Sequence, residues 1–431
     1  KFYDMALFDI DILESRVSKY ETNHIHMVVD GDITYPITNM DNQQYGTFFH
    51  EYIHYMQHMT TLFGVKICAM YNKMFILYRD YIINNETIKL PLELWKNHEG
   101  LMKFIDFFNG VKGSRTCNYN IDAIEISDKE ISDAKKNKKA VKIGIYDFEN
   151  GLAIENGFYF GYMCIIESMA HLIQSFINDK LYHATIPYCS VELICKSIYS
   201  EISNDKKMMI SLCFCSLMFD NSGVAFFDLV ELSKKNQSLN GYELYKKILK
   251  DKSVTHMGKE MPMYRALCLF LDDLKKSISS AIGCKLYYYE EVIENCKNEI
   301  RSGNCVLLDV LYHADISNKN MFSSVFEKVY GYCIQANNLT IMPMNNSKEP
   351  PKPYIETASM IGLELIFKRM KSYSNNTKCE WFKICSKAQY TPDDKTSEEC
   401  LCNQWQKNER CIMTEVLRYF KIKDKEYIQE K

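Results

Sequence analysis

The chain has 431 residues, of which 47% are hydrophobic and 25% are charged, and its formal net charge is −3. This is the composition of a globular protein with two or three domains. The near-neutral charge argues against nucleic acid and against an anionic membrane surface as partners. No run reaches the roughly 18 apolar residues of a membrane span, so we expect no membrane segment.

The 17 cysteines are odd in number and scattered through apolar segments. Buried free cysteine behaves as a small hydrophobe, whereas disulfide frameworks are typical of short secreted chains. The sequence does not open on a charged segment followed by an apolar core, so it predicts no secretory signal. These features predict a reducing compartment, and we expect the cytoplasm.

The first elements in chain order are a hairpin and a helix. Residues 24–38 form two β-rich runs around Asp30-Gly31, a dipeptide that suits a tight turn. A helix is predicted from Asp41 to about Leu62, ending near Gly64. Further helices are predicted at 66–83 and 91–108, the second with Pro91 at its first position, where a missing N–H costs nothing.

The next segment changes character and then returns to helix. Residues 120–127 and 140–148 read as strands around a charged turn at 133–139. An apolar helix follows at about 158–178. The remaining signals predict mainly helix from 187 to 333, a proline-rich linker at 337–354, and helices at 356–373 and 412–420.

Together these elements predict an α+β protein with three parts. Residues 1–185 are expected to form a catalytic core, with 110–151 as an inserted β segment. Residues 186–336 are expected to form a helical domain without a catalytic signature, which suits it to shape a cleft or to bind a protein partner. Residues 337–431 are expected to form a linker and a cysteine-containing helical module.

The strongest chemical signal is His50-Glu51-Tyr52-Ile53-His54, an HExxH motif inside the first predicted helix. Residues four apart share one helix face, so His50 and His54 can bind one Zn²⁺. Glu51 is expected to act as general base towards a metal-bound water. The simpler alternative is a surface helix that carries two unrelated histidines.

A catalytic zinc site also needs a third protein ligand and an open position. Glu167 is the best candidate, because a carboxylate in a strongly apolar helix is costly unless it is paired or bound to a metal. His171, one turn later, is expected to orient Glu167 or a neighbouring ligand. The alternative is that the two simply pair with each other. Weaker candidates for the third ligand are Glu155, Glu192 and Glu201.

His58 lies one further turn along the motif helix. Three histidines from consecutive turns of a straight helix cannot surround one ion. His58 is therefore expected either to hydrogen-bond to a metal ligand without binding the metal or to have a structural role. The metzincin continuation of the motif is absent, because Gln57 and Thr60 stand where that class has glycine and histidine.

His50, Glu51, His54 and Glu167 together resemble the gluzincin type of zinc metallopeptidase. The resemblance covers roughly residues 24–180, and the segment 49–61 is also similar to uncharacterised bacterial HExxH proteins. It implies a zincin-like core in which two histidines and a later glutamate hold the zinc and the motif glutamate is the general base.

Amide hydrolysis also needs a donor for the developing oxyanion. His183 and Tyr188 follow the Glu167 helix closely enough to return to the site. The sequence therefore predicts a zinc metallopeptidase that acts on a peptide or protein substrate. Two alternatives stay open: a non-catalytic binding or regulatory protein stabilised by zinc, and a metallohydrolase that acts on a non-peptide amide or ester.

Overall fold

The computed structural model describes residues 41–114, 116–117, 121–147, 152–178, 180–329, 334–336, 339–341, 370, 398–402, 407, 412–423 and 425–429. Over these residues the protein is mainly helical with small β-sheets, in agreement with the predicted α+β class. The hairpin predicted at 24–38 lies outside the described residues, as do most of the linker at 337–354 and of the helix at 356–373. The division into three domains stays a prediction.

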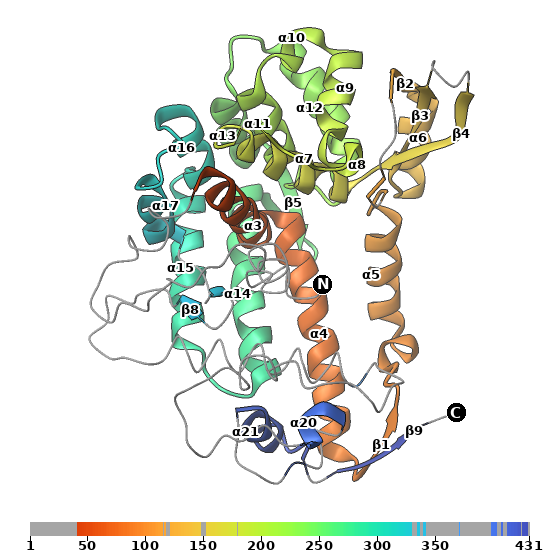
Figure 1. The fold of residues 1–431 in the computed structure, drawn as a ribbon, viewed down its shortest axis with the longest axis vertical. Helices are drawn as coiled ribbons and strands as arrows, with labels where there is room; N and C mark the ends of the chain where they lie inside the picture. Colours follow the sequence, from red (N-terminus) through yellow and green to blue (C-terminus); the bar gives the residue numbers. More distant parts are fainter. Residues whose placement is uncertain are drawn as a thin grey trace.

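Helices make up most of the described chain. In order they are α3 (Asn42–Thr60), α4 (Leu62–Asn84), the 3-10 helix η1 (Leu94–Asn97), α5 (Glu99–Gly110), α6 (Asp128–Asn137), α7 (Tyr162–Gln174), α8 (Thr185–Tyr188), α9 (Ser190–Ile198), α10 (Ser200–Ser203), α11 (Lys206–Ser216), α12 (Ser222–Lys235), α13 (Gly241–Asp251), α14 (Met263–Ile282), α15 (Tyr287–Arg301), α16 (Val306–His313), α17 (Met321–Val329), α20 (Glu399–Cys402) and α21 (Ile412–Tyr419). The long helices α4, α14 and α15 run side by side, with α3 near one end of them (Figure 1).

The strands form small separate sheets. One sheet is antiparallel and has the order β2 (Ala123–Glu125), β3 (Val141–Asp147), β4 (Leu152–Phe160). Strand β1 (Thr87–Leu90) pairs in parallel with β9 (Glu426–Gln429), which brings the C-terminal part of the described chain back beside α4 (Figure 1). Two further hairpins join β5 (Ser253–His256) to β6 (Lys259–Pro262) and β7 (Ile334–Ala336) to β8 (Leu339–Ile341).

Helix α3 is buried on almost every side. Its aromatic face, which includes Phe48, Phe49 and Tyr52, packs edge-on against Phe322 of α17. The opposite face carries His50 and Glu51, which are also buried, and packs against α7. A helix that is apolar on one side and fully covered on the other belongs in the centre of a protein, so its polar residues need partners inside the core.

The junction between α3 and α4 depends on Thr61 and Gly64. Thr61 is extended, and its Oγ1 accepts a hydrogen bond from the Gly64 N–H at 3.2 Å while donating to Gln57 O at 2.6 Å. Helix α3 therefore ends at Thr60, and Gly64 lies in the first turn of α4 instead of ending the motif helix. A Cβ on Gly64 would lie 2.4 Å from His58 Cα, so only glycine allows the two helices to approach this closely.

Two sequence predictions, one before the antiparallel sheet and one between its first two strands, were wrong. The helix predicted to begin at Pro91 begins at Glu99, with the His98 ring accepting a hydrogen bond from the backbone of the first turn. The charged turn predicted at 133–139 is mostly helix α6. It has acidic residues in its first turn and Lys135 and Lys136 in its last turn, which suits the helix dipole.

The start of the Glu167 helix was also placed too early. Phe158 and Phe160 belong to β4, and α7 begins at Tyr162. The register between β3 and β4 shifts beside Gly157, which has a φ of +54°. A Cβ there would lie 1.8 Å from Ile143 O, so this irregularity requires glycine. Gly157 also interrupts the alternation of apolar and polar residues by which a strand is recognised in a sequence.

Among the described residues, no helix is both long enough and apolar enough to cross a membrane.

Candidate metal centre

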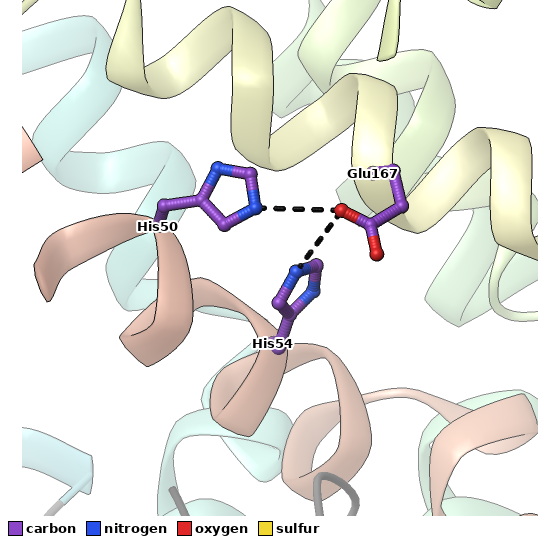
Figure 2. Close-up of side chains that lie close together, drawn as sticks. All are labelled: His50, His54 and Glu167. Atoms are coloured by element: carbon purple, nitrogen blue, oxygen red, sulfur yellow. Dashed lines mark ion pairs between the residues drawn. The ribbon is translucent and has the colours of Figure 1, made fainter. Parts of the chain in front are cut away.

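Two packed helices bring the three predicted ligands together. His50 and His54 lie one turn apart on α3, and Glu167 lies on α7, which packs across that face. Figure 2 shows both imidazoles pointing towards one carboxylate oxygen of Glu167. The three predicted ligands therefore lie together although Glu167 is distant from the two histidines in sequence, and their role as ligands stays a prediction.

The distances fit a shared metal ion. Glu167 Oε2 lies 3.4 Å from His50 Nε2 and 3.5 Å from His54 Nε2, and the three ligand atoms all lie within 4.8 Å of one another. Zinc with donors at 2.0–2.1 Å in a tetrahedron keeps those donors about 3.3 Å apart. The same separations are long for N–H···O hydrogen bonds. Indeed, Glu167 Oε2 is buried without a hydrogen-bond partner, as expected of an atom that faces a metal.

Two of the three side chains in this cluster are partly exposed. The side chain of His50 is 1% exposed, whereas those of His54 and Glu167 are 12% and 16% exposed. In the described part of the chain, no fourth His, Cys, Asp or Glu ligand atom joins the group. Three protein ligands with access from one side are typical of catalytic zinc sites, whereas structural sites are closed by four.

Two glutamines hold the histidine rings. His54 Nδ1–H donates to Gln57 Oε1 at 2.9 Å, and Gln57 Nε2 donates to Ile166 O at 3.0 Å. The second bond fixes the orientation of the Gln57 amide, so its oxygen must face His54. The proton of neutral His54 is therefore on Nδ1, and Nε2 is free to bind a metal.

Gln174 orients the ring of His50, the other histidine of the cluster. His50 Nδ1–H donates to Gln174 Oε1 at 3.0 Å, and Gln174 is buried at the end of α7. Each ligand histidine of α3 is thus oriented through its Nδ1, and each glutamine also ties α3 to α7. Neither role was predicted from the sequence. The available signals were a glutamine three residues after His54 and another glutamine at the end of the apolar helix that carries Glu167.

The charges of the site perturb one another. Burial acts to lower the pKa of His54, but the Glu167 and Glu51 carboxylates raise it to about 9. Burial acts to raise the pKa of Glu167, but His54 and His50 bring it well below its usual range. An anionic Glu167 therefore faces the imidazoles, and either a proton or a metal cation can neutralise it.

The predicted general base lies beside this cluster. Glu51 follows His50 on α3, its side chain is 2% exposed, and its charge reaches His54. His58 is also buried, but its Nδ1–H donates to the backbone oxygen of His54 at 2.6 Å. This contact is made with the helix backbone and not with a histidine ring of the cluster, which favours a structural role for His58.

The predicted oxyanion donors also return to the site. The His183 ring lies 5.5 Å from the His50 ring between centroids, and the Tyr188 ring lies 6.1 Å from it. Their loop is anchored by two backbone hydrogen bonds between Ile186 and Cys117 and by Ser168 Oγ, which donates to Pro187 O at 2.8 Å. The loop therefore holds both side chains beside His50, one of the candidate ligands.

His171 takes a different place from the one predicted. It makes no hydrogen bond with Glu167; instead its Nδ1 lies 2.9 Å from Nδ1 of His183. Burial, together with the charges of His50 and Lys206, lowers the pKa of His171 to about 4, so the ring is neutral at pH 7. His171 therefore supports His183 and not a ligand of the first cluster.

No known family model, curated protein or solved structure matches the chain. The function therefore has to be argued from the site itself.

Proposed function

We propose that this protein is a zinc-dependent hydrolase that cleaves peptide bonds. The observation that carries the proposal is that His50 Nε2 and His54 Nε2 both lie within 3.5 Å of Glu167 Oε2, which has no hydrogen-bond partner, in a partly exposed cluster. Two imidazoles and one carboxylate with tetrahedral spacing suit zinc. The same pairing of a HExxH helix with a glutamate-bearing helix supports a zincin-like core of the gluzincin type.

The residues around the ligands supply what hydrolysis requires. Zinc, when bound, acts as a Lewis acid and makes water a better nucleophile. Glu51 is the proposed general base, which would take a proton from the attacking water and pass it to the leaving amine; its burial and its charge effect on His54 support this role. The His183 and Tyr188 rings lie 5.5 and 6.1 Å from the His50 ring, and either side chain could supply the hydrogen-bond donor that stabilises the developing negative charge.

The alternative of a purely structural zinc site is less well supported. Such a site would be closed by a fourth protein ligand, and the described residues offer three ligands with two of them partly exposed. A structural site also has no need for a buried carboxylate at position 51, which costs free energy without contributing a ligand.

The test is Glu51→Gln, measured for zinc content and for hydrolysis of a quenched fluorescent peptide library. The variant is expected to keep its zinc and to lose hydrolysis by at least about 100-fold, the scale of general-base catalysis. Glu201→Gln is the matched control, because Glu201 is an exposed glutamate on α10. Wild-type hydrolysis by Glu51→Gln, or hydrolysis that survives complete removal of zinc, would contradict the proposal.

A further inference from the structure

A second group of ligand-type side chains lies behind His183. His171 Nε2, Cys189 Sγ and a carboxylate oxygen of Glu192 all lie within 4.8 Å of one another, and the nitrogen and sulfur are 3.9 Å apart. Each residue is partly buried. None of the three belongs to the first cluster, and the proposed hydrolysis uses none of them as a ligand.

The fold builds this group much as it builds the first one. Cys189 precedes α9 and Glu192 lies in its first turn, so these two residues are three apart on one helix face. His171 comes from the last turn of α7, which packs against α9. Two ligands from one helical turn and a third from a packed helix converge, so the arrangement does not depend on flexible surface side chains.

Burial makes the anionic forms of Cys189 and Glu192 costly. Burial, together with the Glu192 carboxylate, raises the pKa of the Cys189 thiol to about 11. Burial also raises the pKa of Glu192, although Lys206 opposes this. The Lys206 ammonium, whose charge acts on Glu192, donates its hydrogen bond to Ser175 Oγ at 2.9 Å. A bound cation would compensate both anionic forms at once.

The histidine of the group is already oriented. His171 Nδ1 and His183 Nδ1 are in hydrogen-bond contact at 2.9 Å, so one of them carries the proton. With the proton on His171 Nδ1, its Nε2 lone pair faces Cys189 Sγ. A metal-binding histidine usually has this kind of hydrogen-bond partner at its other nitrogen.

We propose that His171, Cys189 and Glu192 form a second metal site. A donor set of one sulfur, one nitrogen and one oxygen suits a divalent ion of borderline softness, such as zinc, cobalt or cadmium, rather than calcium or magnesium. In a tetrahedral zinc site, sulfur and nitrogen donors lie about 3.5 Å apart, so the observed 3.9 Å needs only a small closure.

Occupancy of this site would act on the first one. A metal on His171 Nε2 requires the proton on His171 Nδ1, which then donates to His183 Nδ1. The proton of neutral His183 is then on Nε2, in a ring that packs against His50. The second ion would thereby set the tautomer of a proposed oxyanion donor. This consequence rests on the proposed hydrolysis, whereas the metal site itself does not.

The test uses cobalt(II) with the full metal-free chain, because a cobalt–thiolate bond gives a charge-transfer absorption that a site of two histidines and a glutamate cannot give. The wild type is expected to bind two equivalents and to show this absorption. Cys189→Ser is expected to bind one equivalent and to lose the absorption. The control Cys284→Ser, at an exposed cysteine, is expected to behave as the wild type.

Two further variants keep the result specific. Glu192→Gln should weaken the second equivalent without altering the cysteine, and His54→Ala should remove the first equivalent while the thiolate absorption stays. The last variant separates failure of the second site from failure of the first. A thiolate absorption that persists in Cys189→Ser, or a wild type that shows none, would overturn the proposal.

Discussion

Gln57 offers the sharpest quantitative test of how the metal ligands are held. Its side chain is 1% exposed and makes two hydrogen bonds, to His54 Nδ1–H at 2.9 Å and to Ile166 O at 3.0 Å. Gln57→Leu keeps much of the volume but leaves the buried N–H of His54 without an acceptor. An unsatisfied buried donor costs about 1–3 kcal/mol.

That cost falls on the zinc-competent tautomer of His54, so it appears as lost metal affinity. At about 1.4 kcal/mol per tenfold change, we expect zinc affinity to fall by about 10- to 100-fold, which is the usual range for residues behind a metal ligand. Gln57→Glu should lose less, because a carboxylate still accepts from His54 although it cannot donate to Ile166 O.

The assay is competition for zinc against a chelator of known affinity, in the Cys189→Ser background so that only the first site is titrated. The thermal midpoint of each metal-free variant serves as the folding control. If the Gln57→Leu variant binds zinc as tightly as the chain that keeps Gln57, the Gln57 amide does not orient His54 for metal binding.

Three further outcomes are expected. The pKa of His54 is raised from 6.5 to about 9. Protonated His54 beside Glu167 therefore stabilises the metal-free fold fully below pH 6.5, and this stabilisation is lost as the pH rises through 9. Zinc stabilisation of the Cys189→Ser chain should therefore grow over that window, and a constant melting-temperature difference would contradict this. Gly64→Ala should destabilise the fold by at least about 3 kcal/mol, because its Cβ meets backbone of α3 at 2.4 Å; denaturant unfolding measures it. Tyr188→Phe should lower kcat about 100-fold with little change in KM, and an unchanged kcat would remove Tyr188 from the oxyanion role.

The three candidate ligands could be identified from the sequence because their signals are local. The i, i+4 spacing of His50 and His54 needs only a helix, and Glu167 stands out as a carboxylate in an apolar one. The two glutamines were not identified, because their partners are set by how α3 packs on α7. From the sequence, Gln57 marked a departure from the metzincin motif and a similarity to uncharacterised HExxH proteins, and its contact with His54 was not predicted.

The fold was predicted best where the helical pattern is long and least well around the small sheet. Strand β4 was missed because Gly157 interrupts its alternation, and α6 was taken for a turn because its charged residues conceal a short helix. His171 shows a third limit. Its spacing from Glu167 predicted a contact between the two, but the following loop brings His183 to it instead.

The most direct test of the central claim is the zinc content of the purified chain after equilibration with zinc and removal of the free ion. We predict that His50→Ala and Glu167→Gln each bind one equivalent less than the wild type, while Glu201→Gln binds as much. Unchanged zinc content in both ligand variants would contradict the account, because the metal would then be held elsewhere and the arrangement of α3 and α7 would have no metal to position.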